Sequence, residues 1–152
     1  MTEIFKKLNL KDQKVILVLQ APESFEIELA SLENVSVLVT LDEGQQVSFM
    51  LAFVTKLVEI ERMAGALAKK APGDAVVWFA YPKGTSKKYR CEFNRDTGWE
   101  ALGRAGFEPV RQVAIDEDWS ALRFRRAEYI KTLTRDASWA MSKEGKKKAA
   151  KK

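Results

Sequence analysis

The feature that most constrains the fold is a series of four short apolar runs separated by polar turns. Residues 14–20 (KVILVLQ) combine β-branched residues with leucine, a composition typical of a strand buried on both faces of a sheet. Comparable runs occupy residues 35–41, 47–54 and 74–81. The predicted core therefore includes Val15, Leu17, Leu19, Phe49, Leu51, Leu67, Val76 and Trp78.

A helical pattern lies between the third and fourth runs. After Thr55, the expected cap, apolar residues recur at helical spacing at Leu57, Ile60, Ala64, Leu67 and Ala68. A shorter helix capped by Ser24 is expected after the first run. Strands that alternate with helices in this way indicate parallel βαβ units.

The second half of the chain predicts a hairpin. A long polar loop over residues 82–98 leads to a short helix over 99–105, where Thr97 and Glu100 have capping-box spacing. Residues 108–115 and 119–125 are separated only by a tight acidic turn, so we expect them to pair antiparallel at one edge of the sheet. A final helix is predicted over residues 127–141.

These elements predict a three-layer Rossmann-like α/β sandwich of about six strands, mainly parallel with an antiparallel C-terminal strand pair. We expect a single α/β domain over residues 1–142. Residues 143–152 are predicted to be a solvated lysine-rich tail, because they hold six lysines and one glutamate.

The tail accounts for the whole net charge of +5, since the rest of the chain carries 20 basic and 20 acidic side chains. A neutral folded part argues against a nucleic-acid-binding face, which should carry clustered basic residues. Weak non-specific binding of nucleic acid through the tail stays open as an alternative.

Composition also restricts the chemistry. Histidine is absent and Cys91 is the one cysteine, so we expect no metal site and no Ser-His or Cys-His nucleophile. Basic neighbours of Cys91 would favour its thiolate form. A lone cysteine fits a reducing compartment, and no apolar run reaches the roughly 18–20 residues that span a bilayer. We therefore expect a cytoplasmic protein.

Three segments carry a resemblance to a known family. Residues 81–83 (YPK), 94–100 (NRDTGWE) and 110–125, which end in IDxxWSALRFR, resemble a family of small bacterial proteins catalogued as a domain of unknown function. The resemblance implies a Rossmann-like fold of bacterial origin and no particular activity.

A looser likeness is to the class I methyltransferase core. The order of helix, Pro72-Gly73-Asp74 turn, apolar strand, short helix and terminal strand pair is similar to the second half of that fold. Those enzymes carry a glycine-rich turn after the first strand, where the backbone approaches the cofactor. Here residues 20–24 (QAPES) contain no glycine, so we expect no cofactor, neither S-adenosylmethionine nor a dinucleotide. Asp42 and Glu43 are then turn residues rather than ribose ligands.

In open α/β sheets, ligands collect beyond the carboxyl ends of the strands, where the loop over residues 82–98 begins. The loop is rich in basic residues, and long loops in compact domains are often functional. We predict an anion site formed by Lys83, Lys87, Arg95 and Asp96. The alternatives are a solvated connector and a structural role for Asp96 as a helix cap.

The last two predicted strands supply a second candidate surface. Arg111, Trp119, Arg123 and Arg125 are predicted to form a partner-binding strip, with Trp119 partly exposed. The arginines could equally pair with Asp116 and Glu117. Trp78 and Trp99 are expected in the core.

The sequence therefore favours a small non-catalytic binding module for an anionic small molecule or an acidic protein surface. Two alternatives stay open: a degenerate methyltransferase-like or nucleotide-binding enzyme, and a nucleic-acid-associated protein that acts through its basic tail. The turn after the first strand argues against the former, and the neutral folded part argues against the latter.

Overall fold

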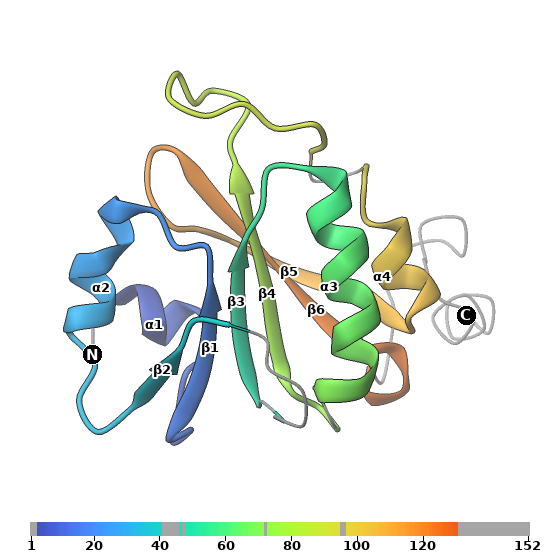
Figure 1. Cartoon of the computed structure of the whole chain (residues 1–152), viewed down its shortest axis with the longest axis horizontal. Coiled ribbons are helices and arrows are strands. Elements are labelled where there is room, and N and C mark those ends of the chain that lie inside the picture. The colour runs from blue at the N-terminus through green and yellow to red at the C-terminus, as the bar shows by residue number, and fades with distance from the viewer. Residues whose placement is uncertain (1–2, 41–45, 47, 72, 95–96, 131–152) are drawn as a thin grey trace.

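Six strands form a single sheet in the computed structural model, which describes residues 3–40, 46, 48–71, 73–94 and 97–130 (Figure 1). The strands are β1 (Val15–Leu19), β2 (Ser36–Leu38), β3 (Phe49–Phe53), β4 (Val76–Pro82), β5 (Phe107–Ala114) and β6 (Trp119–Arg126). The helices are α1 (Glu3–Lys7), α2 (Glu26–Ala30), α3 (Leu57–Lys70) and α4 (Glu100–Arg104), with 3₁₀ turns η1 (Glu23–Phe25) and η2 (Ala127–Tyr129).

The strand order is β2-β1-β3-β4-β6-β5. The first four strands are parallel, and β6 runs antiparallel to both β4 and β5. This arrangement confirms the predicted Rossmann-like α/β fold with an antiparallel C-terminal strand pair. β1 lies inside the sheet between β2 and β3, as its continuous apolar sequence predicts.

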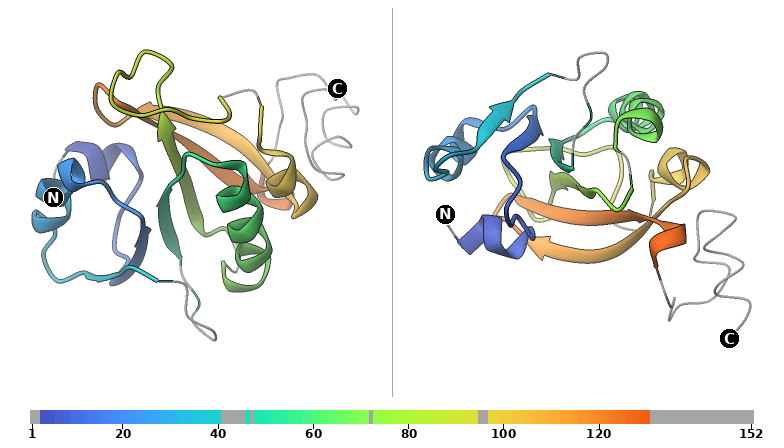
Figure 2. Two further views of the ribbon diagram at one scale, coloured as in Figure 1. Left: turned by 45° about the horizontal axis from the view of Figure 1, so that its top comes forward. Right: turned by 90° about the horizontal axis from the view of Figure 1, so that it is seen from below.

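Helices cover both faces of the sheet, as the two views of Figure 2 show. Residues of α3 and α4 pack against one face, where Ile60, Leu67 and Leu102 join the apolar cluster that contains Met50 and Phe79. The other face packs against α1 and η1.

Seven of the eight predicted core residues are buried, and Val15 is the exception at 43% exposed. Val15 pairs with Ser36 of β2, whereas the pairing of β1 with β3 begins only at Leu17. One flank of Val15 therefore has no strand beside it. β2 is also shorter than predicted, and Val39 beyond its end is 67% exposed.

The N-terminal helix α1 was not predicted. Phe5, Leu8 and Leu10 are buried, and the Trp78 indole nitrogen donates a 2.7 Å hydrogen bond to the Leu8 carbonyl. A helix of 5 residues is too short to show an apolar period, so its formation depends on packing against the sheet.

The predicted helix caps are wrong at three places. Ser24 lies inside η1, α3 begins after Lys56 rather than Thr55, and α4 begins after Trp99 rather than Thr97. In each case the residue before the helix makes no side-chain capping bond.

The predicted helix over residues 127–141 is wrong at its start. Ala127–Tyr129 forms a 3₁₀ turn, and the backbone of Ile130 is extended while its side chain is buried. Residues 131–152, including the predicted tail, lie outside the described residues. Within the described part of the chain, no helix has the length and apolarity needed to cross a membrane.

Candidate functional site

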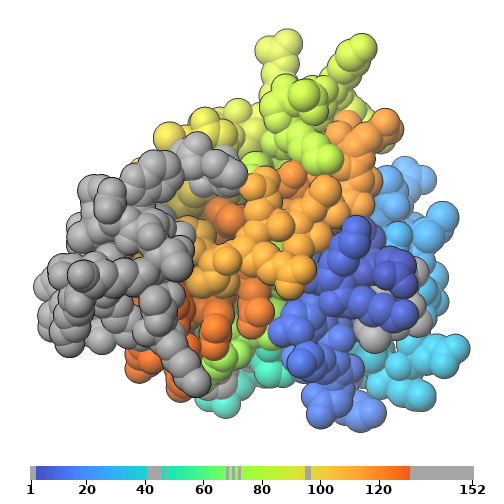
Figure 3. All heavy atoms as spheres, turned by 180° about the vertical axis from the view of Figure 1, so that it is seen from behind, coloured from blue at the N-terminus to red at the C-terminus, as the bar shows by residue number. Residues whose placement is uncertain are grey.

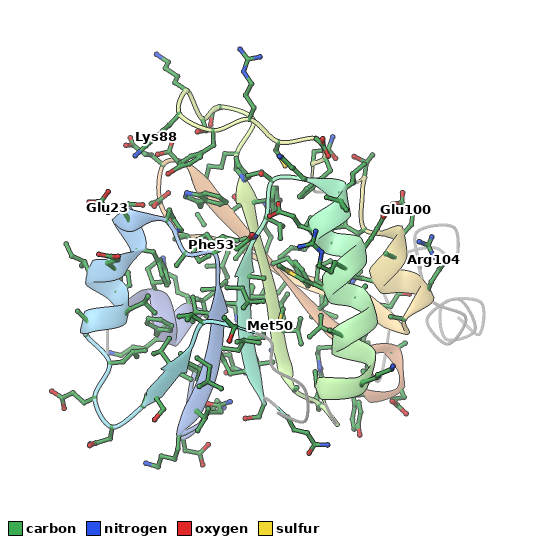
Figure 4. All side chains as sticks on the ribbon, in the orientation of Figure 1. Glu23, Met50, Phe53, Lys88, Glu100 and Arg104 are labelled. Atoms are coloured by element: carbon green, nitrogen blue, oxygen red, sulfur yellow. The ribbon has the colours of Figure 1, made fainter. Side chains whose placement is uncertain are left out.

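The carboxyl edge of the sheet is the candidate site, because the turns after β1, β3 and β4 meet there (Figure 4). Gln20 follows β1, Thr55 lies two residues beyond the end of β3, and Lys83 follows β4. Asp42, Glu43 and Gly44, the expected turn after β2, lie outside the described residues.

A bridge made by the Gln20 side chain crosses this edge. Its amide nitrogen donates hydrogen bonds of 2.8 Å to the Phe53 carbonyl and 2.7 Å to the Glu59 carboxylate. The backbone of Gln20 has a φ of +58°, in the left-handed region that favours glycine. The turn after β1 is therefore tied to the end of β3 and to α3 by a side chain.

Glu59 completes this bridge from α3. Its other carboxylate oxygen accepts the backbone N–H groups of Thr55 at 2.9 Å and Lys56 at 3.0 Å. Burial raises the pKa of Glu59, but the hydrogen bonds from Thr55, Gln20 and Lys56 outweigh it and hold the pKa below its usual value. Glu59 is the third residue of α3, a position where glutamate accepts free N–H groups, but Lys56 stands where a capping box has Ser or Thr, so the full sequence pattern is absent.

A row of aromatic rings fills the space between the first turn and the β5–β6 turn. Ring centroids lie 5.0 Å apart for Phe25–Phe53, 5.0 Å for Phe53–Trp119 and 4.8 Å for Tyr89–Trp119. Trp119 is only 3% exposed, so the predicted partial exposure is wrong. The cause is the edge-on packing of Phe53 and the tilted packing of Tyr89 against its indole ring. The indole N–H has no hydrogen-bond partner among the described residues.

The loop after β4 is anchored at both ends. The Lys83 N–H donates to the Asp118 carbonyl at 2.8 Å, and the Ser86 hydroxyl donates to the Asp118 carboxylate at 2.8 Å. Further along, the Glu92 carboxylate accepts the Leu57 N–H at 2.9 Å at the start of α3. These contacts join the loop to the β5–β6 turn and to α3.

The cations of this loop are displayed on its outer surface. Lys87, Lys88 and Arg90 are exposed and Lys83 is half-buried. The Lys88 ammonium lies 5.6 Å from the Tyr89 ring centroid, and Figure 4 shows Lys88 at the carboxyl edge. Arg95 and Asp96 lie outside the described residues, so the structure places two of the four predicted anion-binding residues.

Asn94, Thr97, Gly98 and Trp99 have structural roles between the loop after β4 and α4. The Asn94 side chain accepts hydrogen bonds from the Thr97 N–H and hydroxyl, and the Asn94 carbonyl accepts the Trp99 indole N–H at 2.8 Å. Gly98 has a φ of +96°, and a Cβ there would lie 2.5 Å from the Phe93 Cβ. The turn therefore requires glycine and seats Trp99 in the core, as expected, at 2% exposed.

Beside this turn, a groove of about 420 Å³ lies between α3 and α4. It is lined by Leu57, Glu61, Glu92, Phe93, Thr97, Gly98, Glu100, Ala101 and Arg104. Its residues come from three separate segments, so no local pattern in the sequence could have indicated it. No group of three metal-ligating side chains occurs within the described ranges.

The pKa of the Cys91 thiol is raised, whereas the basic neighbours in the sequence predict a favoured thiolate. Burial raises the pKa of its thiol, and the Glu92 and Glu59 carboxylates raise it further against a hydrogen bond from the Phe93 backbone. The thiolate is therefore disfavoured, chiefly because the thiol is partly buried and to a smaller extent because two carboxylates lie near it.

The four predicted partner-binding residues fall into two places. Trp119 lies at the carboxyl edge, whereas Arg123 and Arg125 lie further along β6 toward its other end. Arg125 pairs with Asp74 at 3.0 and 2.6 Å rather than with the acidic turn, because Asp74 lies two residues before the start of β4, which pairs with β6. This contact raises the pKa of Arg125. Arg123 lies opposite Arg111 of β5.

No family model matches the chain, and no curated protein matches it. Solved structures resemble its fold. An S-adenosylmethionine-dependent methyltransferase from Aquifex aeolicus superposes with a TM-score of 0.55 at 16% identity, covering 82% of this chain and 88% of that one. A magnesium protoporphyrin IX methyltransferase from Synechocystis, with bound S-adenosylmethionine, superposes with a TM-score of 0.50 at 12% identity, covering 81% and 74%.

At these identities the likeness is one of fold, and fold alone does not carry an activity. It confirms the distant similarity to the methyltransferase core that the order of elements in the second half of the sequence predicts. The chain has the Rossmann-like α/β fold of class I methyltransferases.

Proposed function

We propose that this chain is a non-catalytic binding module on a methyltransferase-like fold, and that the basic loop after β4 contacts an acidic protein surface. The observation that carries the proposal is the Gln20 bridge. In the class I pattern a glycine-rich turn after the first strand lets the backbone approach the cofactor. Here the Gln20 side chain stands at that turn and extends to Phe53 and Glu59.

The residues at this edge do not fit S-adenosylmethionine. The bridge links the turn after β1 to the end of β3 and to the first turn of α3. A ligand that approached the turn after β1 would have to displace the Gln20 side chain and break its two hydrogen bonds, which costs free energy.

The basic loop supports binding of an acidic surface rather than an enclosed small molecule. Lys87, Lys88 and Arg90 project from a loop that is held at Asp118 and Leu57, so their backbone is already ordered. Ordering before contact lowers the entropic cost of association. Exposed cations mainly raise the association rate and confer salt dependence on it.

Calorimetric titration with S-adenosylmethionine, S-adenosylhomocysteine and NAD tests the proposal that the chain is a non-catalytic module. We expect no saturable heat at micromolar concentrations. Saturable binding of any of the three would favour the methyltransferase-like or nucleotide-binding enzyme instead.

Binding of poly-L-glutamate, a model acidic chain, to the full-length protein tests the proposal that the basic loop contacts an acidic surface. The triple variant Lys87→Ala/Lys88→Ala/Arg90→Ala should bind at least about tenfold more weakly than the wild type at low salt. The matched control Lys7→Ala/Lys11→Ala/Lys14→Ala removes the same charge from the N-terminal segment. Equal losses in both triple variants would show that net charge, and not the loop, determines binding.

A further inference from the structure

Strands β5 and β6 carry two arginines directly opposite each other. Arg111 of β5 pairs with Arg123 of β6 in the antiparallel register, and opposed residues of such a pair project from the same face with Cβ atoms about 5 Å apart. Figure 3 shows β5 and β6 forming part of the molecular surface beside the N-terminal segment. Like charges at opposed positions destabilise a sheet, so this pair requires a physical explanation.

Neither arginine has a counterion in the described part of the chain. Asp74 is already held by two hydrogen bonds from Arg125. Glu108, opposite Arg125, is fully buried and makes its own interactions. Arg111 is exposed, and Arg123 is half-buried with its Nε enclosed and without a hydrogen-bond partner.

The surroundings of Arg123 disfavour its charge in the unliganded protein. Trp78, its neighbour on β4, is fully buried and apolar on this face. Burial lowers the pKa of Arg123, the charges of Arg125 and Arg111 lower it further, and Asp74 offsets only part of this effect. A half-buried guanidinium group beside two others lowers the stability of the folded protein. A bound anion would offset this loss of stability.

We propose that Arg111 and Arg123 form a binding site for the phosphate group of a small molecule, separate from the carboxyl-edge loop. Two guanidinium groups on adjacent strands match the charge of a phosphate dianion, and each presents a planar fork of N–H donors that suits its oxygens. The strand pairing holds the Cβ atoms of the two arginines at a fixed separation, so part of the entropic cost of bringing the two guanidinium groups together is already met. Arg125 lies near the site, but its charge is paired with Asp74.

Thermal unfolding of the full-length protein in phosphate and in chloride at matched ionic strength tests the proposal. Phosphate should raise the melting temperature with a saturating dependence, by about 5 °C when its concentration is roughly fiftyfold above the dissociation constant. Acetate, a monoanion, should stabilise less than phosphate. If phosphate stabilises no more than chloride or acetate, the proposal is wrong.

Variants identify the site. Arg111→Gln and Arg123→Gln should each weaken the apparent phosphate affinity about tenfold or more, because each removes one charged partner. In chloride, Arg123→Gln should melt about 2 °C higher than the wild type, since it relieves the repulsion. The control Arg104→Gln removes one exposed charge from α4 and should bind phosphate like the wild type. Unchanged affinity in both strand variants, or an equal loss in Arg104→Gln, would overturn the assignment.

Discussion

The amide of Gln20 and the carboxylate of Glu59 are joined by a 2.7 Å hydrogen bond across the carboxyl edge of the sheet. The two residues lie 39 positions apart in the sequence. Their contact closes the turn after β1 at the place where a methyltransferase-like chain would otherwise present glycine.

Replacing Gln20 by alanine should lower the free energy of unfolding by about 1–2 kcal/mol, because both side-chain hydrogen bonds are lost while the positive φ remains. Replacing it by glycine should cost about 1 kcal/mol less, since glycine adopts this φ without strain. Urea unfolding of the three proteins measures both differences. Equal stability of the glycine and alanine variants would show that the backbone of residue 20 is not held at a positive φ.

The lowered pKa of Glu59 predicts that the free energy of unfolding depends on pH. Its pKa in the folded protein is below its usual value of 4.5, so its stabilising effect is present at neutral pH and is lost as pH falls below about 4.5. The wild type should be more stable than Glu59→Gln at pH 7, and this difference should shrink between pH 4.5 and 3. Urea unfolding of both proteins across this range measures it. A difference that does not change with pH would contradict the hydrogen-bonded carboxylate.

Gly98 should tolerate no side chain. Alanine there would have a φ of +96° and a Cβ 2.5 Å from the Phe93 Cβ and 2.9 Å from the Leu57 Cδ2, so we expect a loss of about 2 kcal/mol or more. The matched control is Gly84→Ala, where a Cβ would meet no atom within 4 Å. That variant should lie within about 0.5 kcal/mol of the wild type. Thermal unfolding compares them, and similar losses at both sites would contradict this account of the turn.

Two of the buried tryptophans, Trp78 and Trp119, form a natural comparison. Phenylalanine at either position removes a similar volume, but only Trp78 loses a hydrogen bond, the 2.7 Å contact with the Leu8 carbonyl. Trp78→Phe should therefore cost about 1–2 kcal/mol more than Trp119→Phe. Urea unfolding gives both values. A larger cost at Trp119 would indicate that its indole N–H has an acceptor in solution.

The apolar runs determined the central strands, and the tight acidic turn determined the terminal hairpin. Residues such as Leu17, Leu51 and Trp78 are buried because their strands are apolar at every position, which leaves only a sheet covered on both faces as a stable arrangement. The fold class therefore follows from local composition. By contrast, α1 and the burial of Trp119 depend on distant partners, so no local period predicts them.

The candidate sites were decided mainly by tertiary structure. The absence of glycine after β1 could be read from the chain, but the bonds of Gln20 to Phe53 and Glu59 exist only because β1 and β3 pair in parallel and α3 follows β3. Arg125 likewise binds Asp74, 51 residues away, rather than the acidic turn beside it in sequence. A sequence determines which side chains are available, whereas strand register determines which of them meet, since hydrogen bonds and ion pairs act only over a few ångströms.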